Sequence, residues 1–286
     1  MASTPTVMEA VSMSEGYLQK HGVESPRLSA EHLLARALDC SRLDLYLRFE
    51  ENLEEKTLKA YRKDLKKRAS HYPLQYILGE TEFFSLPFRM SEGVFIPRPE
   101  TEVLIEAVEK KMKQMEKADF MEIGAGSGII SGTLAKRHPG WRGVTFDISP
   151  EAAFLARKNF KALGVDDRLE ILIADSFDAV CGGSRLDILV SNPPYIPTGD
   201  IEGLQEEVAL FESRVALDGG PDGLSFYPMI AVRGGSLLKS GGLVALEIGD
   251  GQATDVGNIF QNEGYEDIEV WKDYNGKERV MTARKQ

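Results

Sequence analysis

The sequence predicts an α/β fold in which helices cover both faces of a mostly parallel β-sheet, preceded by a small helical domain. From Ala118 onward, strand-like apolar segments alternate with helix-like segments, which is the pattern of βαβ units in a parallel sheet. Residues 1–80 instead show helical spacing of apolar side chains. A chain of 286 residues, 42% of them hydrophobic, can build two modest domains or one large one.

The N-terminal domain is predicted to contain amphipathic helices. Ser25 followed by Pro26 is the signal of an N-cap and a first helical turn. A later helix has a strongly basic outer face, which we interpret as a solvated surface, with a contact surface for an acidic partner or RNA as the alternative. The apolar positions are Leu28, Leu33, Leu34 and Leu38, then Leu53, Leu58, Tyr61 and Leu65, and the basic positions are Lys56, Lys59, Arg62, Lys63, Lys66, Lys67 and Arg68.

Two short apolar runs, Thr81–Phe84 and Pro87–Met90, follow the helical region. They predict a β-hairpin over residues 81–90 that joins a domain of residues 1–80 to a domain of residues 91–286. The proline-containing segment Ile96–Thr101 stiffens the chain. The next helix is predicted through Val103, Leu104, Val108 and Met112.

The second domain is predicted to end in two closely spaced strands. These last segments, Ile268–Tyr274 and Arg279–Thr282, are close enough in sequence to pair antiparallel at one edge of the sheet. The strands predicted before them are Phe120–Ile123, Val144–Asp147, Leu169–Ala174, Asp187–Val190 and Leu243–Ile248, and the helices are Ile129–Lys136, Pro150–Leu163 and Leu224–Leu238.

Composition excludes several classes of protein. No run of about 18 apolar residues is present, so no transmembrane helix is expected. The segment Met1–Glu15 lacks the features of a signal peptide, so we expect a cytoplasmic protein. Cys40 and Cys181 form no Cys-x-x-Cys pair, so neither a disulfide framework nor a metal site is expected. The net charge of -11 arises entirely after residue 90, and this acidity weighs against unaided binding to nucleic acid.

A glycine-rich loop follows the first predicted strand of the sheet and opens the next helix. It reads Gly124-Ala125-Gly126-Ser127-Gly128. Its glycines permit positive φ angles and a close approach of backbone N–H groups to a ligand, and the helix N-terminus adds positive potential. Ile129 follows Gly128, so the spacing departs from the Gly-x-Gly-x-x-Gly pattern of dinucleotide-binding loops.

Two acidic residues follow the next two predicted strands, where open α/β sheets bind their ligands. Asp147 could accept hydrogen bonds from both hydroxyls of a ribose. Asp175, beside Ser176 and Phe177, could bind and stack an adenine. A cationic sulfonium suits such an acidic site better than a pyrophosphate does. The loop and the two acids therefore predict a site for S-adenosylmethionine.

The segment Asn192-Pro193-Pro194-Tyr195 directly follows the fourth predicted strand. A planar NH₂ group is held by two acceptors in its plane, and the Asn192 side-chain oxygen and the Pro193 carbonyl can supply them. Consecutive prolines fix the backbone that aims this carbonyl. Tyr195 offers a flat surface against which an amide or a base can pack. These residues predict a site that holds an NH₂ group beside the methyl donor.

An amide nitrogen is a poor nucleophile because its lone pair is delocalised into the carbonyl. Acceptors on both N–H bonds raise the electron density on nitrogen as positive charge develops, which stabilises the transition state. Binding the sulfonium methyl in line with the nitrogen adds the positional contribution. The motif therefore requires no His or Lys base, and Asn192, Pro193 and Tyr195 are the predicted catalytic residues.

At these residues the chain resembles the protein-(glutamine-N5) methyltransferases that modify class I peptide-chain release factors. The Asn-Pro-Pro-Tyr motif alone is shared with adenine-specific DNA methyltransferases. The segments Arg98–Glu102 and Leu217–Gly220 are more specific to the release-factor enzymes. The other matching segments are Pro73–Gly79, Glu82–Phe88, the glycine loop, Asp147–Pro150, Asn192–Pro197 and Leu246–Gly249.

The resemblance implies a seven-stranded, mostly parallel sheet of the class I S-adenosylmethionine-dependent methyltransferases. It implies that residues 1–80 form a substrate-recognition domain, residues 81–90 a linker and residues 91–286 the catalytic domain. The implied substrate is the glutamine of the Gly-Gly-Gln motif in class I release factors. The implied enzyme is a monomer that requires no membrane and no direct contact with nucleic acid.

The resemblance also assigns site residues by position. Glu122 faces the methionine amino group, although it is one methylene longer than the Asp common in the family, and Ala125 replaces a common Thr. Arg98 and Glu100 are expected to shape the methionine end of the pocket. The implied cofactor-binding residues are Glu122, Gly124, Ala125, Gly126, Ser127, Gly128, Asp147, Ile148, Asp175, Ser176 and Asn192, and the implied substrate-binding residues are Asn192, Pro193, Pro194 and Tyr195.

Other functions share part of this pattern. A DNA or RNA methyltransferase acting on adenine N6 presents a similar NH₂ group, but usually adds a target-recognition region or a basic cleft. A glutamine methyltransferase of a ribosomal protein is a second alternative, from which we expect the Arg98–Thr101 segment to be absent. A non-catalytic cofactor-binding module is the third, and the intact Asn192 and Tyr195 argue against it.

Overall fold

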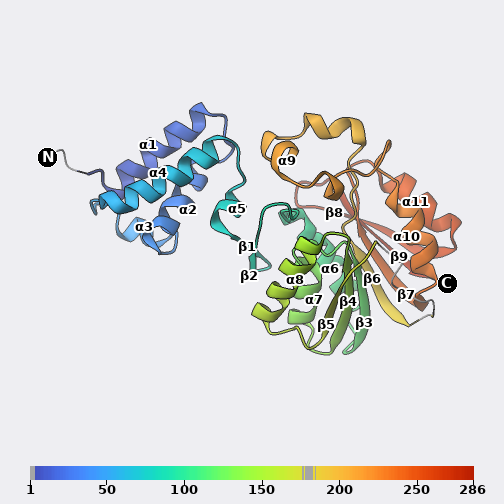
Figure 1. Ribbon diagram of the computed structural model, residues 1–286. Coiled ribbons are helices and arrows are strands. Elements are labelled where there is room, and N and C mark those ends of the chain that lie inside the picture. The colour runs from blue at the N-terminus through green and yellow to red at the C-terminus, as the bar shows by residue number, and fades with distance from the viewer. Residues whose placement is uncertain (1–3, 176, 178–182, 184) are drawn as a thin grey trace. The chain divides into compact units, whose positions relative to one another are not determined.

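The computed structural model describes residues 4–175, 177, 183 and 185–286. The chain forms two compact units. The first contains residues up to Thr81 together with Gln205–Phe211, and the second contains Glu82–Leu204 and Glu212–Gln286. Figure 1 shows a helical first unit and a second unit built around a sheet.

The first unit is a bundle of helices whose core includes the fully buried Leu18, Leu33 and Leu34. Helix α1 begins with a capping box, in which Thr6 and Glu9 exchange hydrogen bonds between side chain and backbone. The remaining helices pack their apolar faces into the same core. The helices of this unit are α1 Val7–Lys20, α2 Pro26–Leu38, α3 Asp44–Leu47, α4 Glu55–Ala69, α5 Leu74–Leu78 and α9 Glu206–Phe211.

The predicted start of α2 is correct, and Ser25 is its N-cap residue, although its side chain takes no part in the cap. Pro26 occupies the first helical turn, whereas Ser25 has a left-handed backbone, with φ of 48°, and makes no side-chain capping bond. The fixed φ of proline favours the helix start without help from the serine hydroxyl.

Arg68 was predicted on the solvated face of α4 and is instead 4% exposed. Its guanidinium lies 2.5 Å from the Glu207 carboxylate, and its Nε donates to the Ser29 hydroxyl. The His71 Nε2 lies 3.0 Å from the Glu206 carboxylate, so this contact and the Arg68–Glu207 ion pair hold α9 in this unit. The basic face of α4 therefore excludes Arg68. It consists of the exposed Lys56, Lys59, Arg62, Lys63, Lys66 and Lys67.

Strands β1, Glu80–Phe83, and β2, Leu86–Arg89, form a two-stranded sheet. Phe84 and Ser85 both have positive φ, at 48° and 56°, as a tight hairpin turn requires. The Phe84 backbone N–H donates to the Glu102 carboxylate at 2.8 Å, which fixes the turn.

The second unit contains a seven-stranded sheet in the order β5-β4-β3-β6-β7-β9-β8. The first five of these strands run parallel, and β9 pairs antiparallel with both β7 and β8. This arrangement confirms the predicted mostly parallel sheet and the antiparallel pairing at its edge. The strands are β3 Ala118–Ile123, β4 Trp141–Asp147, β5 Leu169–Ile173, β6 Leu186–Ser191, β7 Leu238–Glu247, β8 Tyr265–Lys272 and β9 Glu278–Lys285.

Helices cover both faces of the sheet because its strands are apolar on both sides (Figure 1). In β3, Phe120 belongs to the core on one face and Met121 to the core on the other. The first face packs α6 Glu102–Lys111, α7 Ile129–Arg137 and α8 Pro150–Leu163, and the second packs α10 Phe226–Gly235 and α11 Ala253–Asn262.

The predicted helix 224–238 extends too far, because α10 ends at Gly235 and Leu238 already begins β7. A Cβ on Gly234 would lie 2.4 Å from Leu189, so this glycine permits close packing of the helix end on β6.

Strand order places the loops that follow β3 and β6 beside each other. The chain leaves β3 toward β4 on one side, whereas β6 lies on the other side, which makes the gap between β3 and β6 the point where the strand order reverses. Open α/β sheets bind ligands at this point, outside the carboxyl ends of the strands.

Candidate active site

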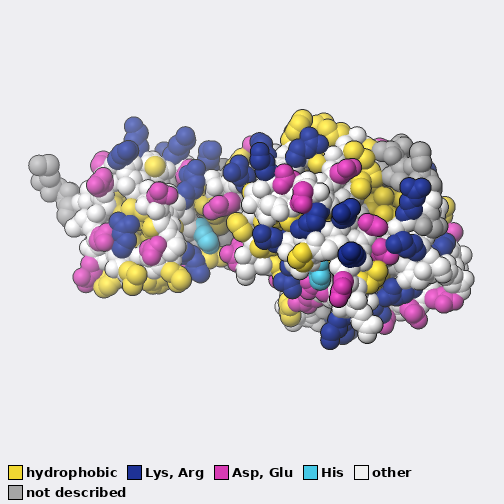
Figure 2. Space-filling model, turned by 90° about the horizontal axis from the view of Figure 1, so that it is seen from below, with side chains coloured by type: hydrophobic (Ala, Val, Ile, Leu, Met, Phe, Trp, Pro, Cys, Tyr) yellow, Lys and Arg dark blue, Asp and Glu magenta, His cyan; other side chains and the backbone are white. Residues whose placement is uncertain are grey.

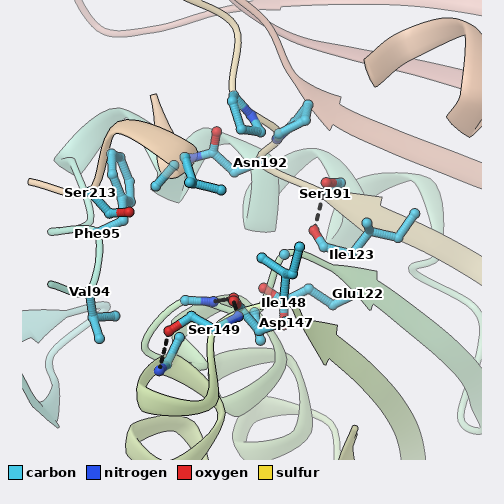
Figure 3. Close-up of a pocket in the computed structure, with 18 of the residues that line it drawn as sticks. Val94, Phe95, Glu122, Ile123, Asp147, Ile148, Ser149, Ser191, Asn192 and Ser213 are labelled. Carbon is cyan, nitrogen blue, oxygen red and sulfur yellow. Dashed lines mark hydrogen bonds between the residues drawn. The ribbon is translucent and has the colours of Figure 1, made fainter. Parts of the chain in front are cut away.

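A cavity of about 610 Å³ opens at the carboxyl ends of β3, β4 and β6. This volume is in the usual range of about 300–1,000 Å³ for cofactor sites. Figure 3 shows Asn192 on one side of the cavity and Asp147 with Ile148 on the opposite side. The predicted site residues that line it are Glu122, Gly124, Ala125, Gly126, Ser127, Asp147, Ile148, Asp175, Asn192, Pro193, Pro194 and Tyr195.

The glycine loop requires its glycines for two different reasons. Gly124 and Gly126 have φ of 75° and 53°, and a Cβ on either would meet no atom within 4 Å, so both leave open space beside the backbone. Gly128 also has a positive φ, but its Cβ would lie 2.6 Å from the Phe160 ring. Gly128 therefore brings α7 against α8 and is not among the residues that line the cavity.

Asp147 ends β4 and is fixed by the loop that it faces. Its two carboxylate oxygens accept hydrogen bonds from the backbone N–H groups of Gly126 and Ser149, both at 2.8 Å. Burial raises the pKa of the Asp147 carboxyl, and these two hydrogen bonds act in the opposite direction. The carboxylate is held at the cavity wall, and each oxygen has a further lone pair to offer a ligand.

Glu122 is fully buried under the glycine loop. Its Oε2 accepts hydrogen bonds from the Ser131 N–H and hydroxyl, whereas its Oε1 has no partner among the described residues. Burial raises the pKa of Glu122 to about 8, and the neighbouring Asp147 charge adds to the rise. A buried acceptor without a donor, at the wall of a cavity, is suited to a ligand that brings an N–H group.

Asn192 is positioned by the end of β6. The preceding Ser191 donates its hydroxyl to the Ile123 carbonyl at 2.7 Å, which ties β6 to β3 (Figure 3). The Asn192 Nδ2 donates to the Thr101 hydroxyl at 3.4 Å. Within the described part of the chain, no group donates to its Oδ1 or to the Pro193 carbonyl. Two acceptors thus remain without a donor among the described residues, and the binding of an NH₂ group by them stays a prediction.

Tyr195 is held from both ends. Its hydroxyl donates to the Glu247 carboxylate at 3.0 Å, and the Gln252 side chain donates to its carbonyl at 2.9 Å. A Cβ on Gly219 would lie 2.8 Å from the Tyr195 Cα, so the Leu-Asp-Gly-Gly segment packs directly against this loop. The next residue, Ile196, exchanges backbone hydrogen bonds with residues 217 and 219.

Arg98 does not line the cavity. Its guanidinium lies 2.5 Å from the buried Glu212 carboxylate and 5.2 Å from the centre of the Phe95 ring. Phe95 does line the cavity, so Arg98 shapes it indirectly. Glu100 is half-buried and also lies outside the lining. Neither residue is part of the cavity wall, and their expected role in shaping the methionine end of the pocket stays a prediction.

Asp175 lies two residues beyond the end of β5 and is exposed at the rim, and Ser176 lies outside the described residues. Thr101 lines the cavity although sequence reasoning gave it no role of its own. Its hydroxyl contacts both Asn192 and Glu247, which are distant in sequence, so no spacing pattern could have revealed it. The described residues contain no group of acidic, histidine or cysteine side chains placed to hold a metal ion.

Comparisons with known families cover most of the chain. Residues 9–79 match the PrmC N-terminal domain, and residues 86–213 match the methyltransferase small domain. In the part of the chain that the structure describes, no helix has the length and apolarity to cross a membrane.

Curated relatives match over nearly the full length. A release factor glutamine methyltransferase of Geobacter sulfurreducens is 41% identical over 279 residues, which cover 98% of this chain and 96% of that protein. One of Moorella thermoacetica is 41% identical over 279 residues, covering 97% of this chain and 98% of that protein. A methyltransferase structure from Pyrococcus furiosus has a TM-score of 0.50 at 16% identity, covers 71% of this chain and 90% of that chain, and shows the shared fold.

Proposed function

The chain belongs to the release factor glutamine methyltransferase family, and from this premise we propose that it transfers a methyl group from S-adenosylmethionine to the side-chain amide nitrogen of the Gly-Gly-Gln glutamine in a class I peptide-chain release factor. The observation that carries the proposal is the full-length identity to enzymes of this name, joined to a cavity that leaves two acceptors open at Asn192 and Pro193.

The cavity fits the cofactor. Glu122 offers its unpartnered Oε1 to the methionine ammonium, and the open space beside Gly124 and Gly126 admits the methionine backbone. Asp147 and Asp175 both line the cavity, and we assign Asp147 to the ribose hydroxyls and Asp175 to the adenine. S-adenosylmethionine supplies the methyl group on a sulfonium. The acidic walls of Glu122 and Asp147 favour such a cationic ligand.

The glutamine amide is held on the opposite side of the cavity in this proposal. The Asn192 Oδ1 and the Pro193 carbonyl each accept one amide N–H, which directs the nitrogen lone pair toward the methyl donor. Tyr195, fixed at its hydroxyl and its carbonyl, provides the surface beside the amide plane. The two acceptors bind more strongly as positive charge grows on nitrogen, so they act on the rate.

The relatives separate the alternatives. An adenine-N6 methyltransferase would use the same Asn192 acceptor, and a ribosomal-protein glutamine methyltransferase the same chemistry. The near-complete match is to enzymes named for release factors, so it favours neither the adenine-N6 methyltransferase nor the ribosomal-protein methyltransferase. The match of residues 9–79 to a domain defined in this family supports their assignment, as residues 1–80, to substrate recognition.

The partner surface and the state of the enzyme are further parts of the proposal. The first unit exposes the basic face of α4 and large apolar side chains such as Leu43 and Leu47. Figure 2 shows Lys and Arg side chains along one side of this unit and hydrophobic side chains along another. We assign these surfaces to the body of the release factor. We further propose that the enzyme acts as a monomer, in the cytoplasm where release factors work, and without direct nucleic-acid contact.

A methyl-transfer assay tests the function. Purified release factor, the same protein with its Gly-Gly-Gln glutamine changed to alanine, and duplex DNA are each offered with labelled S-adenosylmethionine. We expect label only in the unchanged release factor, and none with the Asn192→Ala enzyme as the control. Labelling of DNA, or equal labelling of the alanine variant, would contradict the proposal.

A further inference from the structure

A short series of buried hydrogen bonds links Asn192 to Glu247, a residue that does not line the cavity, through Thr101, which does. The Asn192 Nδ2 donates to the Thr101 hydroxyl at 3.4 Å, and the Thr101 hydroxyl donates to the Glu247 Oε2 at 2.8 Å. The other oxygen of Glu247, Oε1, accepts the Tyr195 hydroxyl at 3.0 Å. The Glu247 carboxylate thus binds both Thr101, which contacts Asn192, and Tyr195, which belongs to the Asn-Pro-Pro-Tyr loop.

These groups are isolated from solvent. Thr101 and Glu247 are each 1% exposed, so water does not offer an alternative partner. Glu247 is the last residue of β7, and Thr101 ends the short helix Pro99–Thr101 that precedes α6. Both therefore stand on regular structure, which suits residues that fix the orientation of a third.

The direction of each hydrogen bond follows from the chemistry of the groups. An ionised carboxylate can only accept hydrogen bonds, so each of the two hydroxyls must use its single O–H to donate a hydrogen bond to Glu247. Thr101 then has only lone pairs to present to Asn192. The Asn192 amide must turn its NH₂ group toward Thr101, which leaves its oxygen, without a donor among the described residues, to meet a ligand in the cavity that Asn192 lines.

Without this constraint, an asparagine amide can rotate by half a turn and present NH₂ in place of oxygen at little steric cost. An NH₂ group facing the cavity would oppose the N–H of the substrate amide donor to donor.

Burial raises the pKa of the Glu247 carboxyl, while the two hydroxyl donors and the nearby Arg279 charge act in the opposite direction.

We propose that Thr101 and Glu247 are positioning residues for methyl transfer, in which the Glu247 carboxylate accepts the hydrogen bond of the Thr101 hydroxyl and so locks the Asn192 oxygen toward the substrate amide. This inference rests on the proposed function and assigns to Glu247 a second task, the fixing of Tyr195 through its hydroxyl. Neither residue touches the reacting atoms, so both act through Asn192 and Tyr195.

Thr101→Val tests the lock, because valine keeps the shape and removes the hydroxyl. We expect the single-turnover rate on release factor to fall on the order of 10- to 100-fold, less than the loss expected for removing the acceptor itself. Affinity for S-adenosylhomocysteine should stay within about twofold. Thr101→Ser keeps the hydroxyl and should recover most of the rate. Glu247→Gln, which can donate to Thr101 and reverse the series, should lose rate as Thr101→Val does.

A matched control comes from α7. Thr133 is fully buried and its hydroxyl has no partner among the described residues, so Thr133→Val makes the same change without breaking a hydrogen bond. Thr133→Val should leave the rate unchanged.

The decisive measurement combines Thr101→Val with Asn192→Ala. If Thr101 acts only through Asn192, the double variant should be as slow as Asn192→Ala alone, since interacting residues are not additive. A further tenfold loss in the double variant, or a near wild-type rate for Thr101→Val alone, would overturn the inference. Failure of the wild-type enzyme to methylate release factor would instead overturn the proposed function.

Discussion

Glu122→Gln is the substitution for which the structure makes the most quantitative prediction. Glu122 is fully buried, its Oε2 is bonded to Ser131 and its Oε1 is without a partner among the described residues. Glutamine keeps the oxygen that Ser131 binds and places an NH₂ group where Oε1 lies. The variant therefore removes the charge and presents a donor to the ammonium of the ligand.

The magnitude follows from the pKa of Glu122, raised by burial from 4.5 to about 8. A charge-assisted hydrogen bond contributes about 1.5–3 kcal/mol, so above pH 8 the variant should bind S-adenosylhomocysteine roughly 10- to 100-fold more weakly. Below pH 8 the wild-type carboxyl must lose its proton to bind the ammonium, at about 1.4 kcal/mol per pH unit. The ratio of the two dissociation constants should therefore shrink about tenfold per pH unit between pH 8 and pH 6.

The same pKa predicts the effect on stability. An acid whose pKa is raised on folding stabilises the folded chain below its usual pKa of 4.5, and this contribution is lost as pH rises toward about 8. The displacement corresponds to an order-of-magnitude cost of about 5 kcal/mol for an ionised, ligand-free Glu122. Glu122→Gln should therefore unfold at a higher temperature than wild type at pH 8, with a smaller difference at pH 5.

Titration calorimetry from pH 6 to pH 9 measures the affinity ratio, and comparing the two proteins cancels the titration of the ligand itself. Two buffers of different ionisation enthalpy would report the proton that wild type releases on binding at pH 7. Glu122→Asp, which keeps the charge, is the control and should retain the pH dependence. A ratio that stays constant over this range would refute the assignment of Glu122 to the ammonium.

Three other substitutions test the remaining parts of the site. Asp147→Ala should weaken S-adenosylhomocysteine binding by roughly 1.5–3 kcal/mol for each ribose hydrogen bond lost, and an affinity within twofold of wild type in calorimetry would contradict its role. Asn192→Ala should lower the single-turnover rate about 10²–10³-fold at nearly unchanged cofactor affinity. The rate of Asn192→Asp should lie between those of wild type and Asn192→Ala. An unchanged rate for Asn192→Ala would exclude Asn192 as the acceptor of the amide N–H. Gly128→Ala should lower the free energy of unfolding, measured with denaturant, by roughly 2–4 kcal/mol, because its Cβ combines a left-handed backbone with a 2.6 Å approach to Phe160. Gly126→Ala has only the backbone strain and should cost about 1–2 kcal/mol. Equal effects of the two variants would argue against the clash with Phe160.

The sheet could be predicted because its strands are buried on both faces. Such strands appear as nearly continuous apolar runs between turns, and Phe120–Ile123 and Leu243–Ile248 have this form, each interrupted by one glutamate. Helix α11, Ala253–Asn262, was not predicted, because Gly257 and Asn258 lower its helix propensity and packing against the sheet decides its structure. Helix α9 spans only six residues and depends on partners far away in sequence.

The residues of the site likewise differ in whether the sequence predicts them. Residues directly after strands, such as Asp147 and Asn192, could be placed because parallel strands bring their carboxyl ends to one edge. Their supports could not, since Thr101 and Glu247 reach the loop from elements separated by most of the second unit's length. Arg98 illustrates the limit of a motif: its position was evident, but its partner Glu212 was visible only in the folded chain.

The discontinuity of the first unit bears on how this protein is made. Helix α9 supplies contacts to the first unit through Glu206, Glu207 and Phe211. Their partners His71, Arg68 and Tyr72 are synthesised more than a hundred residues earlier, so the first helices cannot form these contacts until α9 has been synthesised. Until then Arg68 lacks its carboxylate, and an unpaired buried charge is costly. The N-terminal region should therefore become fully protease-resistant only in nascent chains that extend beyond Phe211.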